Sequence, residues 1–280
     1  MIASLLSTPN QPTWAGASFD AMAADYDSAW TYSFIGELQR RQVWRALIST
    51  FHPGDRILEL GCGTGIDAVH LAEAGIDVHA IDASAGMLRI ARERIAHNGL
   101  SPRVTSELRA VEQLSGMKET GFEGAFSNFG VFNCLQSFTS AEADLARLIR
   151  PGGKLLLCIM GRFCAWETVS YLFRGRPRKA FRRLSARMSG IESSLKAGPR
   201  FRIFYPSVPQ LVAAFRKDFD LVSFRSIGVF VPPSYLEEWA AARRELFRRL
   251  ALLDERVNRW PILRAAGDHR LVIFARRNSN

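Results

Sequence analysis

The stretch Arg56–Gly65 reads Arg-Ile-Leu-Glu-Leu-Gly-Cys-Gly-Thr-Gly, the stretch Asp77–Asp82 reads Asp-Val-His-Ala-Ile-Asp, and together they decide the fold. The run Ile57–Leu60 is short, mainly apolar and ends at glycines, which is typical of a buried parallel strand entering a tight turn. The segment Ile66–Ala74 then has a helical pattern, and its N-terminal amides would face that turn. A second strand is expected to end at Asp82.

The turn between this strand and helix is built to approach a ligand closely. Gly61, Gly63 and Gly65 permit positive φ angles and carry no Cβ that would hold a ligand away. Asp82, at a strand end, is placed where a carboxylate could hold a ribose diol. We therefore predict a nucleoside pocket. The alternative is that the glycines form an ordinary turn and that Asp82 only caps the next helix.

The glycine spacing indicates which nucleoside. A dinucleotide-binding turn, G-x-G-x-x-G, would need a glycine where this chain has Ile66, and the lysine of a phosphate-binding loop is absent. What remains is E-x-G-x-G-x-G, from Glu59 to Gly65. It resembles motif I of the class I S-adenosylmethionine-dependent methyltransferases, of the small-molecule kind (methyltransferase-11/25-like). A carboxylate at Glu59 would repel a diphosphate but suits the cationic methionyl end of S-adenosylmethionine.

Two further segments carry the same resemblance. The lead F-D-x-x-A-x-x-Y-D, Phe19–Asp27, is similar to the N-terminal helix of many small-molecule methyltransferases, in which an aromatic residue closes over the cofactor. Tyr26 is that residue here, although it could equally pack the helix down. The run Leu145–Leu156, Leu-Ala-Arg-Leu-Ile-Arg-Pro-Gly-Gly-Lys-Leu-Leu, matches a later region of the family.

The resemblance implies S-adenosylmethionine as cofactor, S-adenosylhomocysteine as product, and a set of binding positions. The predicted cofactor-binding residues are Tyr26, Glu59, Gly61, Cys62, Gly63, Thr64, Gly65, Asp82, Ala83, Met87, Ala110, Val111, Asn128, Phe129 and Gly130. The predicted substrate-facing residues are Tyr26, Asn133, Arg162 and Trp166. The chain departs from the family after the third expected strand, where the acid usually offered to the adenine amine is replaced by Arg109 or displaced to Glu112.

Strand and helix patterns alternate from Arg56 to Met160, which predicts an α/β fold. We expect a doubly wound, mostly parallel seven-stranded sheet with N-terminal helices. Residues 1–16 are expected to be a flexible tail, and residues 17–160 and 206–280 the cofactor-binding domain. Residues 161–205 interrupt the alternation and are too long for a structureless loop, so we predict a mostly helical inserted lid over the substrate pocket.

Charge is concentrated in that insertion. The chain has a net charge of +10. Residues 161–205 hold eleven basic residues against Glu167 and Glu192: Arg162, Arg174, Arg176, Arg178, Lys179, Arg182, Arg183, Arg187, Lys196, Arg200 and Arg202. This balance favours an anionic partner, such as a nucleic acid, an acidic membrane surface or a carboxylated substrate. The alternative is that the whole chain simply prefers arginine.

Composition argues for a globular protein without a metal. Apolar content of 48% and charged content of 23% are ordinary for soluble domains. The four cysteines form no C-x-x-C pair, so we expect reduced, mostly buried thiols, no bound metal and a cytoplasmic protein. No apolar run is long enough for a membrane-spanning helix. The five histidines lie at positions that packing or solvent explains, so the sequence identifies no catalytic residue.

Methyl transfer from a sulfonium is a one-step displacement that in-line positioning accelerates, and it needs neither a metal nor a covalent enzyme intermediate. The mixture of aromatic residues and arginine in the insertion predicts a small organic acceptor with a flat or lipid-like body and an anionic group. An RNA methyltransferase is the alternative, but the stretch Ser127–Gly130 lacks both prolines of the [DNS]-P-P-[YFW] signature of base methylation. A regulatory cofactor-binding protein and an enzyme touching anionic lipid are further hypotheses. The sequence does not predict an oligomeric state.

Overall fold

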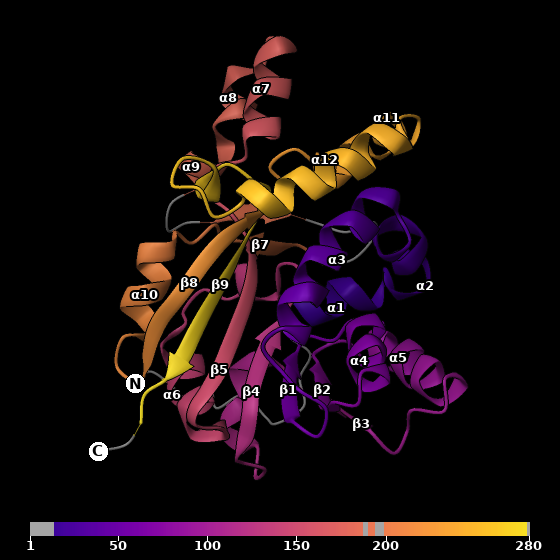
Figure 1. The fold of residues 1–280 in the computed structure, drawn as a ribbon, viewed down its shortest axis with the longest axis vertical. Helices are drawn as coiled ribbons and strands as arrows, with labels where there is room; N and C mark the ends of the chain where they lie inside the picture. The colour runs from indigo at the N-terminus through magenta and orange to yellow at the C-terminus, as the bar shows by residue number, and fades with distance from the viewer. Residues whose placement is uncertain (1–13, 187–189, 194–198, 279–280) are drawn as a thin grey trace, which may run out of the picture.

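The computed structural model describes residues 14–186, 190–193 and 199–278 (Figure 1). Most of the predicted N-terminal tail lies outside these residues. Its last part, however, already belongs to helix α1 (Trp14–Asp20). Helix α2 (Ala23–Tyr26) and a π-helical turn, η1 (Asp27–Thr31), follow before α3 (Phe34–Ile48).

The predicted doubly wound sheet is confirmed. Its order is β3-β2-β1-β4-β5-β9-β8. Those strands are β3 (Val104–Leu108), β2 (Asp77–Asp82), β1 (Arg56–Leu60), β4 (Phe122–Ser127), β5 (Ile149–Met160), β9 (His269–Arg276) and β8 (Phe219–Ile227). The first five are parallel, and β9 runs antiparallel to both of its neighbours. Because the strand order reverses between β1 and β4, a crevice is expected at their carboxyl ends.

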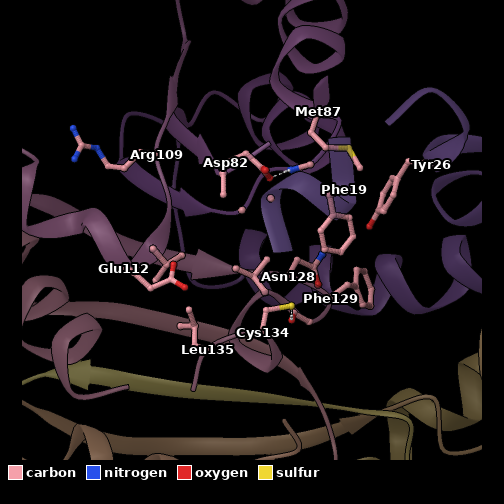
Figure 2. A pocket seen from close by; sticks show the side chains of 17 residues that line it. Phe19, Tyr26, Asp82, Met87, Arg109, Glu112, Asn128, Phe129, Cys134 and Leu135 are labelled. Carbon is pink, nitrogen blue, oxygen red and sulfur yellow. Dashed lines mark hydrogen bonds between the residues drawn. The ribbon is translucent and has the colours of Figure 1, made fainter. Parts of the chain in front are cut away.

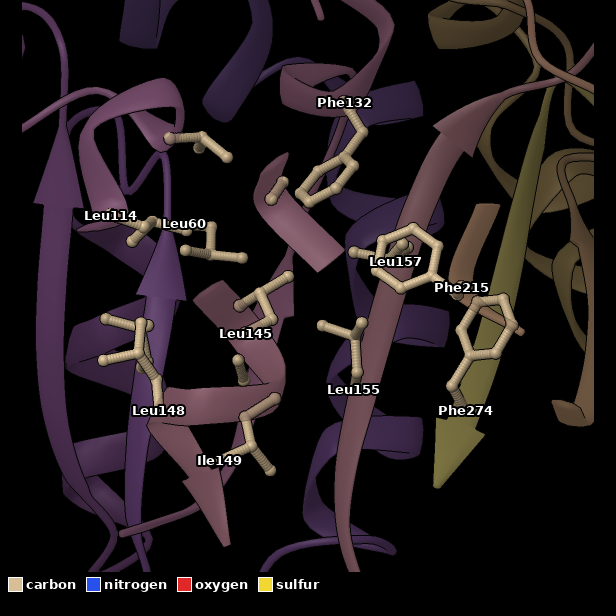
Figure 3. Packing of buried hydrophobic residues seen from close by; sticks show 14 of the residues in the cluster. Leu60, Leu114, Phe132, Leu145, Leu148, Ile149, Leu155, Leu157, Phe215 and Phe274 are labelled. Atoms are coloured by element: carbon tan, nitrogen blue, oxygen red, sulfur yellow. The ribbon is translucent and has the colours of Figure 1, made fainter. Parts of the chain in front are cut away.

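Helices cover both faces of the sheet, and alternation along the strands explains how. Successive side chains of a strand point to opposite faces. On β5, Leu155 and Leu157 therefore pack with α6 (Thr139–Leu148) and α10 (Val208–Phe215), as Figure 3 shows. Leu156 and Cys158 join the other core, with α3, α4 (Ile66–Glu73) and α5 (Ala85–His97). The central strands are thus buried on both faces.

The insertion after β5 is only partly helical. Its described residues form three short helices and a two-stranded hairpin: α7 (Ala165–Phe173), α8 (Pro177–Ala180), α9 (Arg182–Ser185), β6 (Ile191–Ser193) and β7 (Phe201–Ile203). Arg187 and Lys196, counted in the basic cluster, lie outside the described residues. The helical pattern over Tyr235–Leu253 predicts one long helix, but the structure has two, α11 (Glu237–Ala241) and α12 (Arg244–Val257). Short 3-10 turns complete the chain: η2 (Val111–Gly116), η3 (Val131–Asn133), η4 (Ser234–Leu236) and η5 (Leu263–Ala265).

A buried arginine attaches the insertion to the sheet. Nη2 of Arg183 lies 2.7 Å from Oδ1 of Asp268, and its Nε donates to Glu167 at 3.0 Å. Both acids are almost fully buried. Since an unpaired charge in this position would be costly, the three residues hold the base of the insertion against the start of β9. Among the described residues, no helix is both long and apolar enough to cross a bilayer.

Candidate active site

The glycine-rich turn and Asp82 form the centre of the site. The carboxylate of Asp82 accepts a hydrogen bond from the backbone N–H of Gly63 at Oδ2 and one from Ser84 at Oδ1, both at 2.8 Å. These bonds orient the carboxylate and leave each oxygen with a further lone pair. The two hydroxyls of a ribose can each donate a hydrogen bond to such a carboxylate. The structure therefore brings the turn and the end of the second strand together, as the sequence predicts.

The three glycines of the turn have different reasons to be glycine. All have positive φ, at +75° for Gly61, +55° for Gly63 and +78° for Gly65. A Cβ on Gly61 would overlap Val131, and one on Gly65 would come within 2.9 Å of Ala91. A Cβ on Gly63 would meet nothing within 4 Å. Packing thus requires two of the glycines, whereas Gly63 keeps backbone open toward the pocket.

A pocket lies at the carboxyl ends of β1, β2 and β4, closed on one side by the N-terminal helices (Figure 2). Its lining residues are Gly16, Phe19, Tyr26, Gly61, Gly63, Asp82, Ala83, Met87, Arg109, Val111, Glu112, Asn128, Phe129, Gly130, Val131, Cys134 and Leu135. In Figure 2, Phe19, Tyr26 and Phe129 gather at one end, and Arg109 and Glu112 lie at the other. The pocket therefore has an aromatic end and a polar end, with Asp82 between them.

Phe129 at the aromatic end is held in an unusual conformation. Its φ is +46°, and no other described residue apart from glycine has a positive φ. The guanidinium of Arg40 lies 5.0 Å from its ring centroid, and the ring of His269 meets it edge-on at 5.1 Å. A left-handed conformation costs a phenylalanine about 1 kcal/mol or more. The surrounding contacts fix this strained residue where it faces the pocket.

At the polar end, only one of the two charged side chains is free to recognise a base. Arg109 is engaged by Glu107, with Nη2–Oε1 at 2.5 Å, and by the carbonyl of Gln113 at 2.8 Å. The carboxylate of Glu112 has no hydrogen bond or ion pair to a described residue. Of the two positions left open by the sequence, Glu112 is the one with acceptor atoms to spare.

A buried polar cluster lies beneath the aromatic end. Oδ1 of Asp67 accepts from Nη1 of Arg40 at 2.7 Å and from the indole of Trp44 at 2.6 Å. Its Oδ2 accepts from the amide of Asn128 at 2.8 Å, which orients Asn128 in the pocket wall. Three buried polar atoms of this region have no partner in the described structure: Nε of Arg40, Oε2 of Glu59 and Oδ1 of Asn128. Because buried polar groups normally have hydrogen-bond partners, these atoms are available to a polar ligand.

Burial changes the proton affinity of the acids in this region. It raises the pKa of Asp82 to about 6, against hydrogen bonds from Ser84 and Gly63 that lower it. Burial, with Asp67 nearby, raises the pKa of Glu59 well above its ordinary value. The pKa of the Tyr26 phenol is also raised by burial. A cationic ligand group would offset the desolvation of both carboxylates.

The structure brings together ten of the predicted cofactor residues and leaves five behind the wall. Those that line the pocket are Tyr26, Gly61, Gly63, Asp82, Ala83, Met87, Val111, Asn128, Phe129 and Gly130. Those outside the lining are Glu59, Cys62, Thr64, Gly65 and Ala110. Glu59 is 1% exposed. Its position is therefore that of a group acting from beneath the pocket.

Three of the predicted substrate residues lie away from this lining. Asn133 is fully buried, and its amide donates to the carbonyls of Met160 and Phe204 while Oδ1 accepts from the N–H of Met160. Trp166 packs against Trp239 with ring centroids 5.7 Å apart. Arg162, just after β5, is partly buried. Asn133 thus ties η3 to the insertion, and Trp166 ties α7 to α11.

Sequence reasoning did not single out several pocket residues. Phe19 stands in the quoted lead F-D-x-x-A-x-x-Y-D, so the motif contained it, but Tyr26 was chosen alone. Arg40 and Asp67, which lie beneath the pocket, form an ion pair although they are 27 positions apart, and no local sequence pattern predicts such a pair. The four cysteines are unpaired, and Cys134 lines the pocket. Among the described residues, no cluster of His, Cys, Asp or Glu has the arrangement of a metal site.

The sheet, its glycine-rich turn and the carboxylate at the end of β2 define a Rossmann-like, nucleoside-binding fold. The model of the methyltransferase domain family matches residues 57–153. Demethylmenaquinone methyltransferase from Mycobacterium sp. (strain KMS) is 31% identical over 175 residues, which are 60% of this chain and 71% of that protein. The chain therefore belongs to the S-adenosylmethionine-dependent methyltransferases, and S-adenosylmethionine is its cofactor.

Solved structures share the fold. The CcbJ methyltransferase from Streptomyces caelestis aligns with a TM-score of 0.60 at 15% identity, covering 96% of this chain and 100% of that one. The 1,6-didemethyltoxoflavin-N1-methyltransferase of Burkholderia thailandensis, solved with S-adenosylhomocysteine, gives 0.55 at 18% identity and covers 99% and 94%. At these identities the likeness concerns the fold and not the substrate.

The residues present fit the cofactor. Asp82 offers lone pairs to a ribose diol, and the open backbone at Gly63 admits a close ligand. The unpartnered Oδ1 of Asn128 and Oε2 of Glu59 are acceptors suited to a cationic methionyl group. Glu112 lies at the opposite end from the aromatic residues (Figure 2). The pocket thus offers suitable groups for the adenine, the ribose and the methionyl part of S-adenosylmethionine, in the order in which these parts are joined.

Proposed function

We propose that this enzyme transfers a methyl group from S-adenosylmethionine to a small, flat, quinone-like acceptor. The observation that carries the proposal is the division of the pocket into a polar end, a central carboxylate and an aromatic end (Figure 2). The adenine would lie at the polar end, the ribose on Asp82, and the methionyl group toward Asn128. The acceptor would then approach beside Phe19, Tyr26 and Phe129.

Each of these residues has one role in the proposal. Asp82 accepts the ribose hydroxyls, and Glu112 accepts the adenine amine. Asn128, held by Asp67, accepts from the methionyl ammonium, with Glu59 acting from beneath. When bound, the cofactor supplies an electrophilic methyl carbon on a sulfonium sulfur. Holding a nucleophile in line with that carbon is worth several kcal/mol of barrier, and the fixed ring of Phe129 contributes to this positioning.

The closure of the pocket supports a small acceptor. The ring of Phe19 on α1 lies 5.8 Å from that of Phe201 on β7, and the hydroxyl of Ser18 donates to the carbonyl of Pro199. The N-terminal helix and the insertion therefore meet beside the site. A compact molecule fits under such a cover, and the aromatic walls offer stacking to a flat ring. The name demethylmenaquinone methyltransferase, carried by the similar protein from Mycobacterium, adds support for a quinone-like ring.

Methylation of an RNA base remains the alternative. An RNA base would have to reach past α1 and the hairpin β6–β7 to enter the pocket. It would also need to be recognised by stacking in an open basic groove.

The four unpaired cysteines support the further proposal of a cytoplasmic enzyme.

The test uses the whole protein with labelled S-adenosylmethionine and a series of acceptors. We expect methyl transfer to hydroxylated naphthoquinones in their reduced form, and none to unmodified RNA. The variant Phe19→Ala tests the position of the acceptor. It should raise the KM for the acceptor while leaving the Kd for S-adenosylhomocysteine within a few fold. Transfer to RNA without transfer to any quinol would overturn the proposal.

A further inference from the structure

Helix α7 of the insertion exposes apolar side chains instead of burying them. Val169, Leu172 and Phe173 are 48%, 46% and 89% exposed. Their spacing is i, i+3 and i+4, which places them on one side of the helix. Two other residues of the helix make buried polar contacts. Glu167 is buried against Arg183, and the hydroxyl of Thr168 donates to the carbonyl of Ala180. The helix is therefore anchored by polar contacts and turns its apolar side to solvent.

The apolar residues are followed directly by basic ones. Residues 172–179 are all exposed and contain no acid. The basic residues among them are Arg174, Arg176, Arg178 and Lys179. None of the four has a side-chain ion pair with an acid that the structure describes, unlike Arg182 and Arg183 a few positions later. We call residues 169–179 the α7 tip.

The α7 tip projects from the body of the enzyme. In Figure 1, α7 and α8 extend beyond the other elements at the end of the molecule where β5 leads into the insertion. The antiparallel register places Met160, at that end of β5, beside His269 at the start of β9. Arg216 and Lys217 lie at the other end of the sheet, since Phe219 pairs with Arg276 at the end of β9. A flat surface could therefore touch the α7 tip without touching the rest of the sheet.

We infer that the α7 tip binds the surface of an anionic phospholipid bilayer. Exposed aromatic and aliphatic side chains enter the boundary between head groups and acyl chains, and adjacent arginines and lysines bind lipid phosphates. The long arginine side chains also keep their charge at the phosphate level while their methylenes lie along the apolar boundary. Both features are present within eleven consecutive residues, and the charge is complementary to acidic lipid.

An RNA partner explains the same region less well. Arginines and lysines would serve RNA phosphates equally. The exposed aliphatic side chains of Val169 and Leu172, however, offer no stacking surface to a base, and would remain in water on an RNA. Lipid accounts for both the apolar and the basic residues.

The experiment is vesicle sedimentation of the full-length protein, without cofactor or acceptor, so that its outcome does not depend on the proposed acceptor. Vesicles of phosphatidylcholine mixed with phosphatidylglycerol are compared with phosphatidylcholine alone. We expect binding to the anionic vesicles, weakened by salt. Each basic residue near such a surface is worth roughly 1 kcal/mol, about fivefold in partition coefficient, so Arg176→Ser with Arg178→Ser should weaken binding about 25-fold.

Two further variants separate the tip from general charge and folding. Phe173→Ser should weaken anionic binding at least about tenfold, because a buried phenylalanine contributes 1.5 kcal/mol or more, and Phe173→Trp should retain it. Arg216→Ser with Lys217→Ser removes the same charge at the far end of the sheet and should leave binding within about threefold. An unchanged thermal shift with S-adenosylhomocysteine shows that each variant is folded.

Three results would overturn the inference. They are failure of the wild type to bind anionic vesicles, equal losses in the Arg216 and Phe173 variants, and tight RNA binding that Phe173→Ser leaves unchanged. The last result would assign the basic residues to a nucleic acid.

Discussion

The backbone N–H of Gly63 donates a 2.8 Å hydrogen bond to Oδ2 of Asp82, joining the turn after β1 to the end of β2. The two residues lie 19 positions apart and both line the pocket. The bond fixes the position of the carboxylate proposed to bind ribose, and it favours the ionised form against the burial that raises the pKa of Asp82 to about 6.

Replacing that carboxylate should weaken cofactor binding strongly. Asp82→Ala is expected to raise the Kd for S-adenosylhomocysteine about 10- to 100-fold, since hydrogen bonds to a charged group contribute roughly 1.5–3 kcal/mol. Isothermal titration calorimetry measures the change. Asp77→Ala, at the other end of the same strand, is the control and should bind normally. Unchanged affinity in Asp82→Ala would remove the basis of the proposed site.

Cofactor affinity should also fall in acid. Burial raises the pKa of Asp82 to about 6, so the unliganded protein takes up a proton there as the pH drops below that value. The hydroxyl donors of ribose prefer the ionised form. Affinity is therefore expected to be constant above about pH 7 and to weaken by up to about tenfold per pH unit below about pH 6. Asp82→Asn, which does not titrate, should bind weakly with little pH dependence; equal slopes in both proteins would contradict this account.

The glycines of the turn should separate folding from binding. Gly61→Ala forces a Cβ into Val131 at positive φ, so we expect a loss of more than about 2 kcal/mol of stability in urea denaturation. Gly63→Ala meets no atom and should lose only about 1 kcal/mol, but it narrows the pocket and should weaken cofactor binding. Gly54→Ala, also at positive φ in open space, should affect stability alone. If Gly63→Ala and Gly54→Ala bind the cofactor equally well, Gly63 does not face it.

The buried pair beneath the aromatic end should matter more for stability than an exposed pair. Asp67→Asn leaves Arg40 without its counter-charge and should lower the free energy of unfolding by about 3–5 kcal/mol. Asp77→Asn, which breaks an exposed pair with Arg103, should change it by less than about 1 kcal/mol. Urea denaturation measures both. Similar losses in the two variants would show that the buried pair is unimportant.

Local patterns were sufficient for the sheet and its central turn. β1 and β2 lie where the sequence places them, because the apolar run of β1 ends at glycines and the second strand ends at Asp82. The helix predicted over Tyr235–Leu253 is interrupted near Arg243, where the backbone leaves the helical region. The hairpin of the insertion was not foreseen, since three-residue strands carry too short a pattern to recognise.

The site was predictable where it follows the motif, and not where distant segments meet. Gly63 and Asp82 were identified because the turn and strand end carry them. The contacts around Phe129 come from Arg40 and His269, which are remote in sequence and lie together only after the sheet forms. Asn133 shows the reverse: the sequence predicts that it faces the substrate, but its amide is engaged by two backbone carbonyls.

The two covers of the pocket are fastened differently. The insertion is held by Arg183 in a buried ion pair. Helix α1 is held in part by Asp20, an exposed residue whose Oδ1 accepts from the hydroxyl of Ser84 and the N–H of Gly86. Breaking the hydrogen bonds of the exposed Asp20 costs less free energy than breaking the buried ion pair of Arg183. Since Ser18 and Phe19 also contact Pro199 and Phe201, a substitution that loosens α1 would remove one attachment of the insertion beside the pocket as well.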